Sequence, residues 1–175
     1  SIDAELQAFT AARFGAQTGA AVVMDVHTGE VLTLVSVPSF EPNLFSQGIR
    51  SEDWRGLINH PYRPLTNKAI AGQYSPGSTF KTVVAMAAPV GGLAAPGQSF
   101  SCRGHVALGE SMFHCWKKGG HGTLDMHAGI QQSCDVYFYE LARRVGIERI
   151  AQMAYRLGLG NVLDIELPGE QPGIV

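Results

Sequence analysis

Residues 78–88, S-T-F-K-T-V-V-A-M-A-A, are so apolar that a helix formed by them should be buried in a core. The chain is long enough to bury it, because 175 residues can form one domain with a real hydrophobic core. Apolar residues make up 45% of the chain and charged residues 16%, a balance typical of globular proteins rather than disordered or fibrous ones. The sequence therefore predicts a globular domain with a buried helix at 78–88.

The segments around this helix show a mixture of extended and helical patterns. Residues 20–37 are rich in β-branched and apolar residues around H-T-G-E, which predicts a β-hairpin whose turn uses Gly29. Helical patterns cover residues 2–14 (with Asp3 as N-cap), 51–58, 124–144 and 147–158. This order favours one α+β fold. Since a two-stranded hairpin makes a poor sheet alone, we expect its partner strands to follow residue 175.

The overall charge and hydropathy exclude two classes of protein. The formal net charge of −2 offers no basic surface for nucleic acid. No apolar run approaches the ~20 residues of a membrane span. The chain opens with S-I-D-A-E-L-Q and stops in a Pro/Gly-rich stretch, so we expect it to be part of a longer protein whose anchor or targeting segment lies elsewhere.

Ser78 and Lys81 form the first candidate site. They are three residues apart, so on a helix both side chains lie on one face. Pro76 and Gly77 place Ser78 at the start of the helix, where negative charge on its oxygen is favoured. A lysine buried among apolar residues can be neutral and take the serine proton. The alternative is an N-cap serine beside a solvated lysine.

A second candidate motif lies at the start of the helical pattern that contains Q-Q-S-C-D-V-Y-F-Y. Ser133 and Asp135 are two residues apart, and a short loop could direct both into a cleft. A hydroxyl and a polar acceptor there could relay a proton between Lys81 and a leaving amine. In the alternative interpretation, one of the two residues only caps the helix.

Together these motifs resemble the transpeptidase domain of class B penicillin-binding proteins, most closely the penicillin-binding protein 2 subfamily of rod-shape elongation. The resemblance is carried by G-A-A-V-V-M-D-V-H-T-G-E-V-L, P-L-T-N-K-A-I-A-G-Q-Y-S-P-G-S-T-F-K, W-K-K-G-G-H-G and S-C-D-V-Y-F-Y-E-L-A. It implies the fold shared by penicillin-binding proteins and serine β-lactamases. It also implies that Ser78 is the acylated nucleophile, Lys81 its general base and Ser133 a proton relay. Asp135 stands where many relatives have Asn.

The third motif of the family, K-T-G, does not occur in these residues, and K-K-G-G at 117–120 is too glycine-rich to replace it. The resemblance therefore implies that residues 1–175 are the N-terminal portion of a single transpeptidase domain. That motif contributes to the oxyanion hole, and one missing donor typically costs about 10²–10³ in rate. We therefore expect this portion to lack normal turnover.

The resemblance further implies what the parent protein does. It would be a peptidoglycan D,D-transpeptidase that forms a serine acyl-enzyme on D-alanyl-D-alanine stem peptides and is acylated by β-lactams. It would act at the periplasmic face of the bacterial inner membrane, beside a membrane glycan polymerase of the elongation machinery. It would need no cofactor for this chemistry.

Three cysteines and a histidine form a separate candidate site. Cys102, Cys115 and His121 lie in the Gly-rich stretch 91–123, and Cys134 lies between Ser133 and Asp135. Folded together, they could hold a structural Zn²⁺ that orders the stretch. The alternatives are a Cys102–Cys115 disulfide with Cys134 as a small buried residue, or free thiols. His114 is a substitute ligand, while His60, His105 and His127 are interpreted as ordinary residues.

The sequence is also compatible with two other functions. A serine β-lactamase or β-lactam sensor would share the serine and lysine, although the string around P-G-S-T-F-K resembles the transpeptidases more. A non-catalytic, metal-stabilised binding module would make Ser78 and Lys81 purely structural. The reactivity of Ser78 discriminates between the module and the enzymes.

Overall fold

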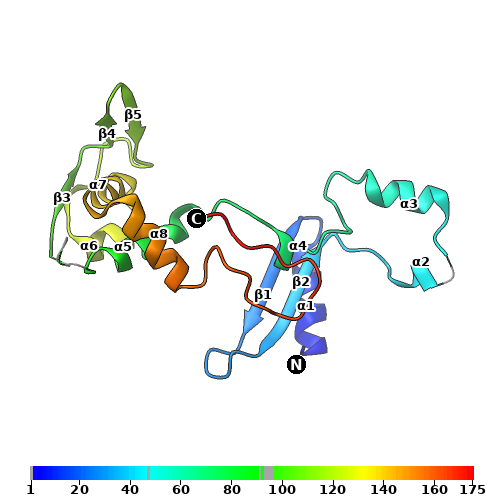
Figure 1. Cartoon of the computed structure of the whole chain (residues 1–175). Helices are drawn as coiled ribbons and strands as arrows, with labels where there is room; N and C mark the ends of the chain where they lie inside the picture. Colours follow the sequence, from blue (N-terminus) through cyan, green and yellow to red (C-terminus); the bar gives the residue numbers. More distant parts are fainter. Residues whose placement is uncertain (1, 47, 91, 93–96) are drawn as a thin grey trace. The chain divides into compact units, whose positions relative to one another are not determined.

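The computed structural model describes residues 2–46, 48–90, 92 and 97–175, which form two compact units. The first unit comprises the residues up to Gln73 together with Asp164–Gln171, and the second comprises Tyr74–Leu163 with Pro172–Val175. Both contain helices and antiparallel strands (Figure 1), so the predicted α+β class is confirmed. That the whole chain belongs to a single domain stays a prediction.

A β-hairpin and the helix beside it form the centre of the first unit. Strands β1 (Gly19–Met24) and β2 (Val31–Val37) pair antiparallel, and Gly29 (φ 75°) takes a left-handed position in their turn, as predicted. Helix α1 (Ala4–Phe14) is capped by Asp3, whose side chain accepts from the Leu6 N–H. The Gln7 amide exchanges two hydrogen bonds with the Leu34 backbone, so α1 satisfies part of an otherwise open strand edge.

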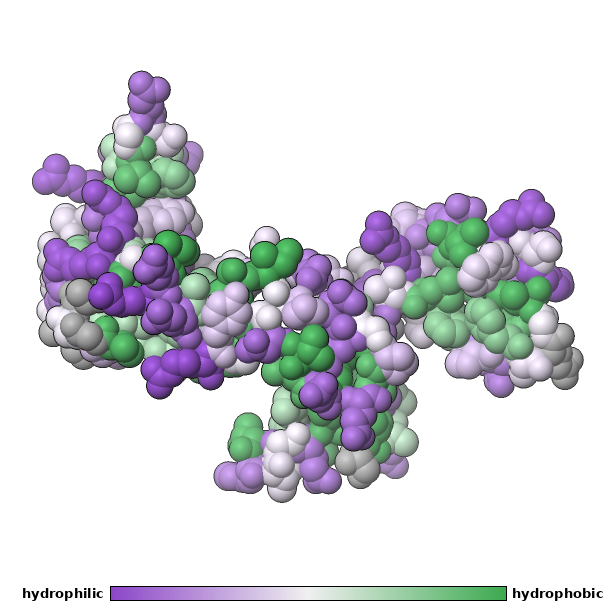
Figure 2. Space-filling model, viewed as in Figure 1, coloured by the Kyte–Doolittle hydropathy of each residue, from purple (hydrophilic) through white to green (hydrophobic). Residues whose placement is uncertain are grey.

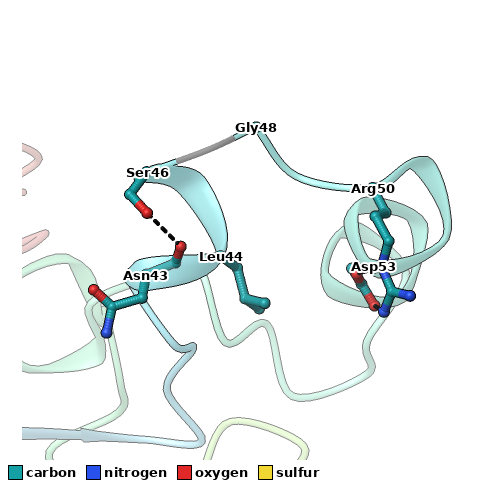
Figure 3. A pocket seen from close by; sticks show the side chains of 6 residues that line it. All are labelled: Asn43, Leu44, Ser46, Gly48, Arg50 and Asp53. Carbon is teal, nitrogen blue, oxygen red and sulfur yellow. Dashed lines mark hydrogen bonds and ion pairs between the residues drawn. The ribbon is translucent and has the colours of Figure 1, made fainter.

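The remainder of the first unit is built from three short helices, α2 (Asn43–Ser46), α3 (Ser51–Ile58) and α4 (Lys68–Ala71). The predicted helix at 51–58 is confirmed. The ring of Phe45 meets those of Phe40 and Trp54 edge to face. An open pocket of about 650 Å³ lies between α2 and the start of α3 (Figure 3), lined by Asn43, Leu44, Ser46, Gly48, Arg50 and Asp53.

The second unit has a helical core. Most of its buried side chains come from α5 (Lys81–Ala87), α7 (Asp135–Val145) and α8 (Ile147–Arg156). Ile150, Met153 and Ala154 of α8 face this core, and Figure 2 shows mostly hydrophilic residues over α7 and α8 on the opposite face. No described helix is both long and apolar enough to cross a bilayer.

The predicted buried helix at 78–88 differs in its first turn. Residues Gly77–Phe80 form the 3₁₀ turn η1, and the α-helix begins at Lys81. The cause is the entry, because Gly77 has a positive φ (58°) and follows a proline that cannot donate a backbone hydrogen bond. Val83, Val84, Ala85 and Ala87 are buried as expected, but Met86 is 48% exposed, so the helix is buried on one side rather than all round.

Two other predicted segments are also corrected. The helix expected at 124–144 is divided into α6 (Met126–Gln131) and α7, because Ser133 adopts a left-handed conformation (φ 47°). The Gly-rich stretch 91–123, for which the sequence predicts no helix or strand, contains short strands: β3 (Phe100–Cys102) pairs with β6 (Gly122–Leu124), and β4 (His105–Leu108) pairs with β5 (Ser111–His114). Residues 91 and 93–96 of this stretch lie outside the described residues.

A matched pair of glycine substitutions tests the packing of α6. In Gly129→Ala the new Cβ would stand 2.8 Å from the buried ring of Tyr137, so we expect a loss of about 1–3 kcal/mol in the free energy of unfolding. In Gly56→Ala, within α3, nothing lies within 4 Å of the new Cβ. There the better helix propensity of alanine should raise stability by about 0.4–1 kcal/mol. Urea unfolding measures both, and a stabilising Gly129→Ala would contradict the packing described.

Candidate active site and metal centre

The exposed turn η1 presents Ser78 at the entry to α5. A 3₁₀ turn has three residues per turn, so residues i and i+3 are eclipsed, which places Ser78 and Lys81 on one side. Ser78 caps neither helical element, since the N-cap of η1 is Pro76 and that of α5 is Phe80. The alternative in which Ser78 is only an N-cap is therefore wrong. Its hydroxyl makes no hydrogen bond to Lys81 in the described part of the chain.

Lys81 is bound by the turn that separates α6 from α7. Its Nζ donates to the carbonyl oxygen of Ser133 (2.8 Å), to Ser133 Oγ (3.0 Å) and to Asp135 Oδ1 (2.6 Å). An ammonium group has three donors, and all three are used here. Only 15% of the lysine side chain and 23% of the aspartate side chain are exposed. The alternative of a solvated surface lysine is therefore wrong.

The turn that holds Lys81 is strained but well bonded. Ser133 has a positive φ, which costs a non-glycine residue roughly 1–2 kcal/mol. The backbone N–H groups of Ser133 and Cys134 donate to the carbonyls of Ile130 and Gly129, which closes the turn. The N-cap of α7 is Cys134, whose sulfur accepts from the Tyr137 N–H. Neither Ser133 nor Asp135 is that cap, so their side chains remain available to Lys81.

Asp135 is held as a carboxylate from two sides. Burial raises the pKa of Asp135, but hydrogen bonds from Lys81 and from the Trp116 backbone N–H outweigh this effect, and the net pKa lies below its ordinary value. Oδ1 accepts from Lys81, while Oδ2 accepts from the Trp116 N–H at 3.0 Å. The arrangement fixes the carboxylate plane relative to the lysine.

Trp116 is a residue at this site that sequence reasoning missed. Its indole Nε1 donates to the Gln132 carbonyl (3.1 Å), and its ring meets that of His121 edge to face at 5.1 Å. The sequence signal was its place in C-W-K-K-G-G-H-G, directly after Cys115. Sequence alone gave no reason to connect it with Gln132 or Asp135.

The structure brings Cys102, Cys115, His121 and Cys134 together, with one potential ligand atom from each within 4.8 Å of all the others. His121 Nδ1 lies 3.5 Å from Cys115 Sγ and 3.7 Å from Cys102 Sγ, and the sulfurs of Cys115 and Cys134 are 4.0 Å apart. A tetrahedral zinc site with ordinary bond lengths has N···S edges of about 3.6 Å and S···S edges of about 3.8 Å. The four donors therefore fit Zn²⁺.

Two glycines explain why these ligands meet. A Cβ on Gly104 would collide with the backbone oxygen of Lys118, and one on Gly120 would collide with the backbone oxygen of Cys102. The two chain segments therefore cross at a distance that only glycine permits, and both glycines have positive φ. The crossing brings His121 beside Cys102. The Cys115 N–H donates to the Gly104 carbonyl, which adds the third ligand.

The surroundings of Cys115, Cys134 and His121 shift the pKa values of these residues in different directions. All three cysteines are buried and free. Burial lowers the pKa of His121, which favours the neutral imidazole that binds metals, and its Nε2 is buried without a partner among the described residues. Burial raises the pKa of the Cys134 thiol to about 12. Burial also acts to raise the pKa of Cys115, but hydrogen bonds from the backbone N–H groups of Lys117, Val136 and Asp135 outweigh it, so the net pKa of Cys115 is lowered.

The other histidines lie apart from this cluster. His114, the substitute ligand, is exposed on β5 opposite His105 of β4, with ring centroids 6.2 Å apart. His127 is exposed on α6, and His60 belongs to the first unit beside Tyr62.

Comparisons of the sequence with a family model and with curated proteins match the same family. The family model described as the penicillin-binding protein transpeptidase domain matches residues 19–175. A protein of Acinetobacter baumannii named peptidoglycan D,D-transpeptidase MrdA is 41% identical over 176 residues, which is 99% of this chain and 26% of that protein. The chain thus spans about a quarter of the length of this curated relative.

Solved structures of similar proteins match the fold as well. The penicillin-binding protein PBP2 of Helicobacter pylori has a TM-score of 0.94 and 32% identity, over 99% of this chain and 33% of that one. Penicillin-binding protein A of Mycobacterium tuberculosis, solved as an imipenem acyl-enzyme complex, has a TM-score of 0.87 and 27% identity, over 98% of this chain and 42% of that one. A chain of a peptidoglycan synthase complex that coordinates polymerization and crosslinking has a TM-score of 0.78 and 31% identity. The match covers 94% of this chain and 30% of that one.

The glycine crossing yields a prediction about cysteine reactivity. Gly120→Ala should separate the crossing segments and raise the rate at which iodoacetamide alkylates Cys102 by roughly tenfold or more, because the buried thiol becomes accessible through local opening. Gly119→Ala is the matched control, since nothing lies within 4 Å of its new Cβ. Equal alkylation rates in the two variants would show that the crossing does not hold the cluster.

Proposed function

The chain belongs to the penicillin-binding protein transpeptidase family, and on that premise we propose that it forms the nucleophile-bearing part of a peptidoglycan D,D-transpeptidase. The observation that carries the proposal is the bonding of Lys81 to Ser133 and Asp135, one helical turn from an exposed Ser78. These residue types at these places supply a nucleophile, a base and a proton relay in one cluster. Because the chain covers about a quarter of its curated relative, the activity is proposed for the whole protein.

The proposed reaction is acyl transfer through a serine ester. Ser78 Oγ attacks the carbonyl carbon between the two terminal D-alanines of a stem peptide, the C–N bond breaks, and D-alanine leaves. An amine of a neighbouring stem then attacks the ester, releases Ser78 and forms the crosslink. β-Lactams present a similar carbonyl and would acylate the same oxygen. The similar mycobacterial protein was solved as an imipenem acyl-enzyme complex, which supports a covalent acyl intermediate in the proposed reaction.

The contacts suggest a path for the proton of Ser78. With its three donors engaged, Lys81 must lose one proton to solvent before it can accept that of Ser78, and Asp135 Oδ1, 2.6 Å away, stays a carboxylate that orients Nζ. Ser133 Oγ, 3.0 Å from Lys81 Nζ, can pass a proton from the lysine to the leaving amine. An asparagine, which many relatives have here, could accept the same hydrogen bond but would lack the negative charge that Asp135 places beside Lys81.

The partners proposed for the whole protein follow from this function. Its substrates are peptidoglycan stem peptides and its inhibitors are β-lactams, with no cofactor for the chemistry. The likeness to a chain of a synthase complex that couples polymerization to crosslinking supports a membrane glycan polymerase as partner. Such work takes place at the periplasmic face of the inner membrane.

We also propose that Cys102, Cys115, His121 and Cys134 hold a structural Zn²⁺. When bound, the metal would supply four strong bonds between the glycine-rich segments and the residue beside Ser133, and no chemistry of its own. The chain's own residues do the rest: the glycine crossing sets the ligand spacing, and Trp116 covers His121.

The assignment of Ser78 is tested by mass spectrometry of the full-length protein with a penicillin. The wild type should gain one covalent adduct, and Ser78→Ala should gain none because the attacking oxygen is gone. Thr82→Ala is the matched control, since it removes an exposed hydroxyl one turn further along that donates to the Thr79 carbonyl. Its adduct should be unchanged. An unreactive wild type, or an adduct that persists in Ser78→Ala, would favour the non-catalytic module.

The zinc proposal is tested by exchanging two histidines for glutamine. The wild type should contain one zinc per chain, and His121→Gln should weaken zinc binding roughly 100-fold or more by removing a ligand. His114→Gln, on the exposed β5 strand, should keep the metal. Native mass spectrometry and competition with a chelator measure both, and a wild type with a Cys102–Cys115 disulfide and no zinc would contradict the proposal.

A further inference from the structure

We infer that Trp116 is a positioning residue that fastens the turn carrying Ser133 and Asp135 in the shape the reaction needs; this inference rests on the proposed function. Two different polar groups of Trp116 bond to this turn. Its backbone N–H donates to Asp135 Oδ2 at 3.0 Å, and its indole Nε1 donates to the Gln132 carbonyl at 3.1 Å. One residue thus bonds on both sides of Ser133.

The two bonds act on the groups that face Lys81. Because Oδ2 is occupied by the Trp116 N–H, the aspartate presents Oδ1 to Lys81. The bond from the indole to the Gln132 carbonyl fixes the orientation of the peptide group between Gln132 and Ser133. This peptide group directly precedes the left-handed Ser133. A non-glycine residue stays in that conformation only when its surroundings fix it. Trp116 supplies one such restraint and Lys81, on the Ser133 carbonyl, supplies another.

Burial does not explain the position of Trp116. The residue is 64% exposed, although an indole offers one of the largest apolar surfaces of any side chain. Packing in the core would have hidden it, whereas here polar bonds and one edge-to-face contact with His121 hold it at the surface. Two hydrogen bonds and one ring contact, rather than burial in the described core, therefore set the place of Trp116.

Trp116 also connects two parts of the second unit. It directly follows Cys115 and its ring lies against His121, so it belongs to the crossed glycine-rich segments. Through Gln132 and Asp135 it reaches the end of α6 and the start of α7. Through these bonds, the fixed position of the glycine-rich segments restrains the turn that holds Lys81.

The test compares Trp116→Phe with Trp54→Phe. Trp116→Phe keeps a ring against His121 and the backbone N–H but removes the bond to Gln132, whereas Trp54 lies in the first unit, outside this site. Two quantities are measured in the full-length protein: the second-order rate constant of acylation by a fluorescent penicillin, and hydrogen–deuterium exchange in peptides from the turn and from α8. Zinc content is measured alongside.

For Trp116→Phe we expect acylation about fivefold to tenfold slower, the effect of about one net hydrogen bond. We also expect faster exchange of the Ser133 and Cys134 amides, unchanged exchange in α8, and unchanged zinc content. Trp54→Phe should match the wild type in all of these. Exchange that accelerates in α8 as well would make Trp116 an ordinary stabilising residue and overturn the inference.

Two further outcomes would also overturn it. Unchanged acylation and exchange in Trp116→Phe would show that the indole bond positions nothing, and slower acylation with unchanged exchange would make Trp116 a direct substrate contact. The failure of the proposed function looks different, because then the wild type itself would not be acylated. In that case the exchange of the turn amides alone decides whether Trp116 fastens the turn.

Discussion

The ion pair between Lys81 and Asp135 is the interaction on which the second unit depends. A partly buried lysine is stabilised by a partner of opposite charge, and removing one member of the pair would leave the other partly buried and unpaired. The pair joins residues 54 positions apart and ties the start of α5 to the start of α7. The pair also fixes the position of the Ser133 hydroxyl, because the same Nζ donates to both the carbonyl and the hydroxyl of that residue. Stability and chemistry therefore rest on the same few atoms.

The glycine-rich segments help to fix the turn that carries Asp135. Gly104 and Gly120 allow two chain segments to cross, the crossing places Cys102 and His121 together, and Cys134 connects their cluster to the turn. Cys134 is both a donor in the cluster and the N-cap of α7, so a metal there would act directly on the residue between Ser133 and Asp135. Trp116 provides a second, non-metal connection to the same turn. A segment with little apolar core is thus ordered by close backbone contacts and polar bonds.

Local patterns allowed much of the fold to be predicted from the sequence. The hairpin with Gly29, the cap at Asp3 and the helix at 51–58 depend on neighbouring residues, and the structure confirms them. The 3₁₀ turn before Lys81 and the left-handed Ser133 depend on contacts across the fold, which is why the predicted helices at 78–88 and 124–144 differ from the observed ones. The spacing of Ser78 and Lys81 is local and could be seen in the sequence. The bonds of Trp116 reach residues 16 and 19 positions away, so they could not be predicted from it.

The central claim is that Lys81 organises the turn and activates Ser78. The most direct measurement is the rate of penicillin acylation in Lys81→Met, compared with Lys118→Met, whose side chain is exposed. Loss of a general base typically costs 10²–10⁴ in rate, so Lys81→Met should be acylated at least about 10²-fold more slowly while Lys118→Met matches the wild type. Acylation of Lys81→Met at the wild-type rate would contradict the account, because Ser78 would then be activated without the lysine.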